Sequence, residues 1–301
     1  MTGLALLAVL PALVLLIVIY RADNIEKEPI SKMAQVFGLG CLTVISALIL
    51  ETLGSYALNI LFWGQTDNFL YTFLMMFGVV AMSEEAGKFV VLKLSTWNSP
   101  EFNFSFDGIV YSVCATLGFA TVENIKYVWN YGLDTALVRM VMSVPGHCIF
   151  GIFMGIYYGL AKGCEMRGDM TGKKINLYKA FFIPVFLHGL YDFSCSYNAP
   201  GMIIVLIGLE IFMTVKAIMM VNKMSKNDMP LTPNMQQMYY QQAQQMNYQQ
   251  PMQQAQQMNY QQPMQQAQQM NYQQPIQQVQ QNFDQGPVNN KPVFTPENIE
   301  G

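Results

Sequence analysis

Residues 69–94 read FLYTFLMMFGVVAMSEEAGKFVVLKL, an apolar stretch with Glu84, Glu85 and Lys88 at its centre. A bilayer core about 30 Å thick requires about 20 apolar residues in a helix, so this stretch is long enough to cross a membrane. Ionisable side chains are costly inside a bilayer and usually have a function there. The stretch therefore predicts a transmembrane helix that carries part of a functional site.

Six further stretches have a similar apolar composition, at roughly 4–20, 33–62, 108–129, 135–161, 178–197 and 200–222. The first lacks the basic start and the small-residue cleavage site of a signal peptide, so it is counted as a span. The sequence predicts an all-α fold, a polytopic membrane helix bundle with about seven transmembrane helices. This transmembrane domain covers residues 1–226.

Basic residues are unevenly distributed along the chain. Residues 227–301 contain one of the 16 basic and four of the 19 acidic residues, so residues 1–226 contain 15 of each. This balance excludes a nucleic-acid binder that works through a basic patch. Basic residues lie between alternate spans, which by the positive-inside rule places the N-terminus outside and the C-terminal tail in the cytoplasm. We expect a multi-pass protein of the cell membrane, with the lipid bilayer as a partner.

The last part of the chain has a different composition. Residues 241–252 read QQAQQMNYQQPM, and this unit recurs at 253–264 and, with one change, at 265–276. A segment so rich in glutamine cannot bury a core. We expect residues 227–301 to form a disordered, Gln-rich cytoplasmic tail, either a plain flexible segment, which we favour, or a self-association segment.

Four consecutive spans carry ionisable motifs. His147 and His188 are the only histidines, and both lie in apolar stretches. His188 and Asp192 are four residues apart and share a helix face, so Asp192 can accept the second ring N–H of His188. The remaining ionisable members are Glu84, Glu85 and Lys88 in the third span and Glu123 in the fourth. Together these side chains favour a site over scattered structural residues.

Helix geometry separates the two neighbouring glutamates. Glu84 and Lys88 are four residues apart, so Lys88 can neutralise Glu84 within its own helix. Glu85 points about 100° away from Glu84. We therefore expect Glu85 to be the freer carboxylate, facing the bundle interior as a general base. Arg139 lies near a span end, where a long basic side chain can reach the membrane surface.

The motifs resemble those of the PrsW family of intramembrane proteases. They are E-E-x-x-K at 84–88, F-x-x-x-E-N at 119–124, H-x-x-x-G at 147–151 and H-x-x-x-D at 188–192. The resemblance covers roughly residues 1–225, and the family is distantly similar to CAAX-processing membrane proteases. It implies hydrolysis of peptide bonds in a membrane-anchored protein substrate, such as the first cut in an anti-sigma factor. It also implies as site residues Glu84, Glu85, Glu123, His147, His188 and Asp192.

Two mechanisms fit these residues. In the first, His147, His188 and Glu123 hold Zn²⁺ and Glu85 takes a proton from a zinc-bound water. In the second, no metal binds, Glu84 or Glu85 activates water directly, and the histidines stabilise the oxyanion. Two histidines with one carboxylate form a known catalytic zinc set, which favours the metalloprotease. Glu123, however, is predicted near the outer end of the fourth span, whereas Glu84 is predicted nearer the cytoplasmic end of the third span. The two side chains therefore need not meet.

Two other functions compete with the protease. Intramembrane glutamate, histidine and aspartate residues also build the proton relays of proton-coupled membrane transporters. Such transporters commonly contain internal repeats, and none is visible in residues 1–226. A non-enzymatic scaffold that presents the tail would leave the four ionisable motifs unexplained. The sequence favours the protease.

Overall fold

The computed structural model describes residues 2–232, 234, 236–238 and 241. The chain divides into two units, Met1–Pro233 and Asn234–Gly301, and almost all of the described residues belong to the first unit. The predicted tail and its repeats lie almost wholly outside the described residues. The disordered tail and the boundary at residue 226 therefore stay predictions.

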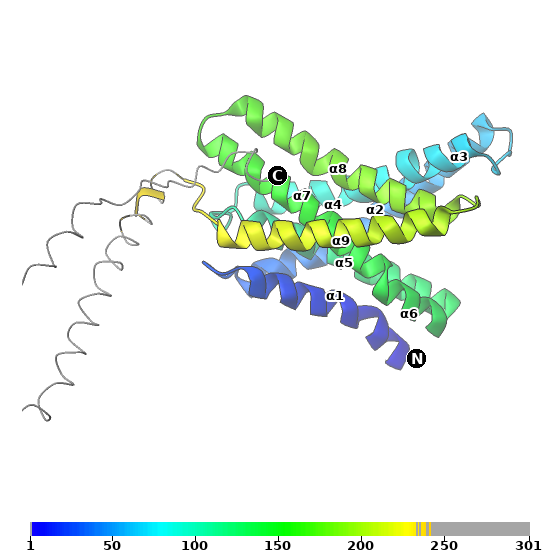
Figure 1. The fold of residues 1–301 in the computed structure, drawn as a ribbon, viewed down its shortest axis with the longest axis horizontal. Coiled ribbons are helices and arrows are strands. Elements are labelled where there is room, and N and C mark those ends of the chain that lie inside the picture. The colour runs from blue at the N-terminus through cyan, green and yellow to red at the C-terminus, as the bar shows by residue number, and fades with distance from the viewer. Residues whose placement is uncertain (1, 233, 235, 239–240, 242–301) are drawn as a thin grey trace, which may run out of the picture. The chain divides into compact units, whose positions relative to one another are not determined.

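The first unit is a bundle of helices (Figure 1). In chain order these are α1 (Thr2–Ala22), α2 (Ile30–Leu61), α3 (Phe69–Phe73), the π-helix η1 (Leu74–Ala81), α4 (Met82–Thr96), α5 (Asp107–Tyr131), α6 (Leu133–Val141), α7 (Ser143–Met166), α8 (Met170–Ser196) and α9 (Met202–Lys226). The described residues contain no β-strand, and their one isolated bridge joins Phe104 to Pro230. The predicted all-α membrane bundle is confirmed.

Among the described residues, five helical stretches are long and apolar enough to cross a membrane: Ile30–Leu61, Phe69–Thr96, Asp107–Tyr131, Leu133–Met166 and Met202–Lys226. They correspond to five of the seven predicted spans. The first predicted span gives a shorter apolar helix in its described part, Ala8–Ala22. The sixth corresponds to α8, whose lysines and Asp192 reduce its apolar character.

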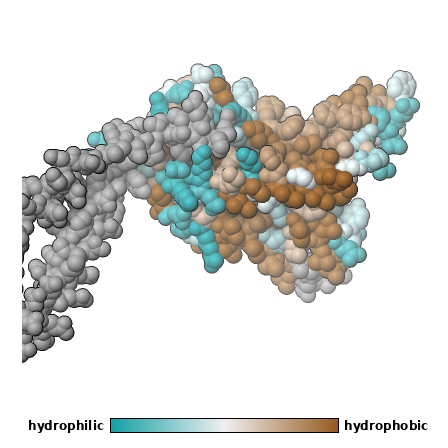
Figure 2. Space-filling view, viewed as in Figure 1, coloured by the Kyte–Doolittle hydropathy of each residue, from teal (hydrophilic) through white to brown (hydrophobic). Residues whose placement is uncertain are grey.

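The helix α5 forms the centre of the bundle. In its most apolar window 83% of the residues are buried, compared with 17% in α9, which therefore lies at the periphery. The surface over α9 and α1 is strongly hydrophobic (Figure 2), as expected of helices that face lipid.

Glycines bring α7 against α5. A Cβ atom at Gly155 would lie 2.5 Å from the carbonyl oxygen of Gly108, and one at Gly159 would lie 2.4 Å from that of Ser105. Such distances leave no room for a larger residue, so these glycines serve close helix packing. The two helices that carry Glu123 and His147 are thereby held in direct contact.

Two irregular segments lie close to the ionisable motifs. The π-helix η1 ends at Ala81, just before the two glutamates of α4, and π segments are frequent at functional sites. The predicted fifth span is interrupted at Met142, between α6 and α7. Pro145 occupies the first turn of α7, where a proline is tolerated because its missing N–H has no helical partner.

Candidate active site

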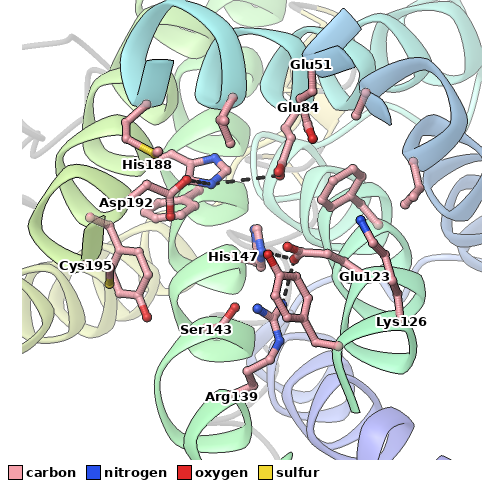
Figure 3. Close-up of a pocket in the computed structure, with 18 of the residues that line it drawn as sticks. Glu51, Glu84, Glu123, Lys126, Arg139, Ser143, His147, His188, Asp192 and Cys195 are labelled. Carbon is pink, nitrogen blue, oxygen red and sulfur yellow. Dashed lines mark hydrogen bonds and ion pairs between the residues drawn. The ribbon is translucent and has the colours of Figure 1, made fainter. Parts of the chain in front are cut away.

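A cavity of about 400 Å³ contains most of the predicted site residues (Figure 3). Its walls come from α2, η1, α4, α5, the α6–α7 segment and α8. Glu84, Glu123, His147, His188 and Asp192 all line it, so the fold brings together residues from four separate motifs. On the rim, Leu48 of α2 and Val138 of α6 are exposed, so the cavity reaches the side of the bundle.

Lys88 holds both glutamates of α4. Its Nζ lies 2.7 Å from Glu85 Oε1 and 3.2 Å from Glu84 Oε2, and it also lies 4.0 Å from the centre of the Phe119 ring. Lys88 and Glu85 are fully buried. The prediction that Glu85 is the freer carboxylate is therefore wrong. Lys88 is three residues from one glutamate and four from the other, and both spacings allow contact.

Glu84, rather than Glu85, borders the cavity. Glu85 is fully buried and does not line the cavity. Its Oε1 lies 2.9 Å from His188 Nδ1 as well as close to Lys88. Its second oxygen, Oε2, is buried and has no hydrogen-bond partner among the described residues. The two neighbouring carboxylates are thus chemically distinct, one facing the cavity and one facing the histidine.

His188 lies between carboxylates on both sides of its ring. Nδ1 faces Glu85, while Nε2 lies 3.2 Å from Asp192 Oδ2 and 3.9 Å from Glu84 Oε2. The spacing of four residues along α8 produces the Asp192 contact, as the sequence predicted. An ionised carboxylate only accepts hydrogen bonds, so Asp192 can accept from Nε2–H and Glu85 Oε1 can accept from Nδ1–H, and the two contacts fix the orientation of the ring.

His147 is held in the same way by Glu123. Its Nε2 lies 2.9 Å from Glu123 Oε2, whereas its Nδ1 is buried and has no hydrogen-bond partner within the described chain. Glu123 Oε2 also accepts a hydrogen bond of 2.8 Å from Arg139. Both histidines therefore have a carboxylate at Nε2, but they differ at Nδ1, which faces Glu85 in His188 and has no partner among the described residues in His147.

Arg139 was predicted to reach the membrane surface, but it points into the site. Its Nε donates to Asn124 Oδ1 at 3.0 Å, and its guanidinium lies 4.1 Å from the centre of the Tyr127 ring. Arg139 thus contacts three side chains of α5, those of Glu123, Asn124 and Tyr127, and these contacts hold the short helix α6 against the cavity. Sequence reasoning missed this contact because Arg139 lies on a different helix from its partners, and only its intramembrane position marked it.

The candidate metal ligands differ from the predicted set. One donor atom from each of Glu84, Glu85, His147 and His188 lies within 4.8 Å of the others. Glu123 is outside this group and contacts His147 on its far nitrogen, so the geometry does not match its predicted role as a ligand. Glu84 and Glu123 do line one cavity, because the third span extends to Thr96 and leaves Glu84 near its midpoint.

Charge also fits a cation at this group. The ion-paired set contains four carboxylates, of Glu84, Glu85, Glu123 and Asp192, and two permanent cations, Lys88 and Arg139. With neutral histidines the sum is −4 + 2 = −2, which a divalent cation would balance. Glu85 Oε2 and His147 Nδ1 are buried and have no hydrogen-bond partner in the described part of the chain. They are oxygen and nitrogen donors of the kind that zinc binds.

Comparison with known proteins identifies the chain. Residues 28–221 match the family described as PrsW family intramembrane metalloprotease. The chain belongs to the PrsW family. It is therefore a membrane-embedded peptidase, as its four ionisable motifs predicted, and the family match gives no support to a transporter.

Relatives that carry the name Protease PrsW come from several bacteria. The protein of Oceanobacillus iheyensis is 38% identical over 183 residues, which is 61% of this chain and 78% of the relative. That of Clostridioides difficile is 30% identical over 208 residues, or 68% of this chain and 84% of the relative. That of Bacillus subtilis is 31% identical over 183 residues, or 61% and 78%. No solved structure matches the chain.

Proposed function

We propose that this PrsW-family peptidase cuts membrane-anchored protein substrates in the cavity bordered by Glu84, using a zinc ion. The observation that carries the proposal is the convergence of Glu84, Glu85, His147 and His188, with donor atoms within 4.8 Å of one another. The exposed apolar rim residues Leu48 and Val138 support a substrate that arrives from the bilayer. The resemblance to proteins that start anti-sigma-factor cleavage suggests a substrate of that type.

Within this site we assign Glu85, His147 and His188 as metal ligands. Among the described residues, Glu85 Oε2 and His147 Nδ1 have no hydrogen-bond partner. His188 Nδ1 faces Glu85 Oε1 at 2.9 Å, and a bound metal would replace this contact. Two histidines and one carboxylate form a catalytic zinc set with an open fourth position. Zinc in such a site lowers the pKa of a bound water to about 7.

Glu84 is the general base in this assignment. Its carboxylate borders the cavity, where it can take a proton from the attacking water and return it to the leaving amine. Lys88 fixes the Glu84 carboxylate from behind, at 3.2 Å. Glu123 accepts from His147 Nε2 and leaves its Nδ1 as the lone-pair donor, and Asp192 would do the same for His188 once a metal replaced the contact between its Nδ1 and Glu85. Without metal, Glu84 would activate water directly and the histidines would stabilise the oxyanion.

Two variants test the proposal. Purified protein in liposomes is mixed with a library of single-span peptides, and cut products and bound metal are measured together. His188→Ala should abolish both cleavage and metal binding. Asp192→Asn should reduce both by about 10- to 100-fold, the usual effect of losing a partner of a metal-binding histidine.

Other outcomes would change the conclusion in definite ways. If His188→Ala loses cleavage but contains as much metal as the wild type, His188 is not a metal ligand. Full cleavage by His188→Ala would exclude the site altogether. Cytoplasmic placement of the C-terminus, which rests on the distribution of basic residues, is tested separately by protease access to a C-terminal tag.

A further inference from the structure

A second concave surface lies between α4 and α8, away from the active site. This groove has a volume of about 610 Å³, and its walls are mostly aromatic and aliphatic. Phe89 of α4 and Phe181 of α8 meet across it with ring centres 5.7 Å apart. Val90 and Tyr178 on its sides are exposed, so the groove opens at the outer surface of the bundle.

Two lysines lie at one end of this groove. Lys93 is in the last turn of α4, and Lys174 is in the second turn of α8. The same end carries Trp97, whose ring lies 5.3 Å from Lys173 Nζ, so the end of α4 and the start of α8 are at the same level. The groove is therefore apolar along most of its length and cationic at this end.

These two lysines lack the partners that their neighbours have. Glu165 binds Lys162 at 3.0 Å and also pairs with Lys173. Within the described chain, neither Lys93 nor Lys174 forms an ion pair or a hydrogen bond through its side chain, and no acidic residue lines the groove. The end of the groove thus presents two positive charges without an acidic partner, and it is complementary to an anion.

We propose that the groove binds an anionic phospholipid, with the phosphate between Lys93 and Lys174 and an acyl chain against Phe89 and Phe181. A soluble phosphate would leave the aromatic part of the groove uncovered. The transmembrane helix of a substrate would need a route to Glu84, but the groove and the active-site cavity share no lining residue. The proposal requires only that the protein lies in a bilayer and does not depend on the cleavage mechanism.

Native mass spectrometry of the full-length protein tests the site. The protein is titrated in mixed micelles with phosphatidylglycerol or with phosphatidylcholine, and bound lipids are counted. Wild type should prefer phosphatidylglycerol. Lys93→Gln and Lys174→Gln should each weaken its binding about fivefold, because a basic residue near an anionic lipid surface contributes about 1 kcal/mol. Leu177→Trp, which fills the groove, should reduce binding of both lipids.

The control variant is Lys223→Gln with Lys226→Gln, which removes two lysines from the last turn of α9, outside the groove. It should bind phosphatidylglycerol as the wild type does, and water-soluble glycerol phosphate should not compete. Equal binding of both lipids by the wild type, or unchanged preference in the Lys93→Gln, Lys174→Gln double variant, would overturn the proposal. So would competition by glycerol phosphate, or a dimer that excludes lipid from the groove. Melting temperatures show that each variant is folded.

Discussion

Lys88 makes the two adjacent glutamates unequal. It pairs more closely with Glu85, at 2.7 Å, than with Glu84, at 3.2 Å. Glu85 is enclosed with Lys88 and His188, whereas Glu84 also borders the cavity. Removing either charge should therefore stop cleavage, but the effects on stability should differ.

Glu84→Gln should lower the cleavage rate by at least about 100-fold, the usual contribution of a general base, with little change in melting temperature. Glu85→Gln should abolish cleavage and also destabilise the fold by about 3 kcal/mol, because it disrupts a buried ion pair. Rates in liposomes and melting curves in detergent measure both effects. Asp67→Asn, in an exposed loop, is the control. A fully active Glu84→Gln variant would exclude Glu84 as the base.

Arg139 should position His147 through Glu123. Arg139→Gln would leave Glu123 without its cationic partner, 2.9 Å from His147. We expect kcat to fall by about 10- to 100-fold with a smaller change in KM, and metal affinity to fall in parallel. Arg139→Lys, which keeps the charge but not the planar fork, should be intermediate. The exposed Arg21→Gln is the control. Equal metal affinity in Arg139→Gln and wild type would contradict this role.

The residues that sequence could identify were those that are rare inside a membrane. The two histidines and the glutamate pair were visible because each interrupts an apolar stretch, and the His188–Asp192 contact followed from helical spacing alone. Arg139 and the true orientation of Glu85 were not visible, because both depend on which faces of different helices meet. Helix periodicity gives the angle between neighbouring residues but not the direction in which the pair points.

At the scale of elements, the contact between α5 and α7 places Glu123 beside His147. Gly155→Leu should separate these helices, since a Cβ atom there would lie 2.5 Å from Ile109 Cα. We expect destabilisation of about 1–3 kcal/mol, together with loss of cleavage. Gly208→Leu in α9, where a Cβ atom has no neighbour within 4 Å, is the matched control and should be tolerated. Thermal unfolding and cleavage assays compare the two, and equal tolerance would contradict the close packing.

The length of elements was partly predictable in the same physical terms. Five spans followed from apolar length, but the break at Met142 did not, because α6 and α7 are both apolar enough to read as one helix. The π-helix η1 also leaves no mark in composition. Both irregularities lie beside the cavity, and Met142 lines it.

At the scale of the whole molecule, residues 227–232, which follow α9 within the first unit, pack against the start of α5. Asp228 accepts hydrogen bonds from Ser105 Oγ and from the Phe106 N–H, at 2.7 and 2.8 Å. Burial, with the Asp228 charge nearby, raises the pKa of Asp23 to about 6, and burial raises the pKa of Asp228 to about 6. Both carboxyls therefore keep protons in the folded state at pH values where the unfolded chain has lost them.

This difference predicts that stability falls as the pH rises. The contribution is fully present below about pH 4, the ordinary range of an aspartate, and is lost as the pH passes through about 6. Asp23→Asn should raise stability at pH 7.5 by on the order of 1 kcal/mol, with little effect at pH 4. Melting temperatures between pH 4 and 8, with Asp67→Asn as control, measure this. The same pH profile in wild type and Asp23→Asn would contradict the assignment.

Cleavage of a single-span peptide by metal-stripped protein tests most directly whether this PrsW-family member is a metal-dependent peptidase. The protein is treated with chelator, shown by elemental analysis to be metal-free, and placed in liposomes with the peptide. We expect no cut product, and we expect one equivalent of Zn²⁺ to restore cleavage in wild type but not in His188→Ala. Wild-type cleavage rates from verified metal-free protein would contradict the zinc site and leave Glu84 to activate water alone.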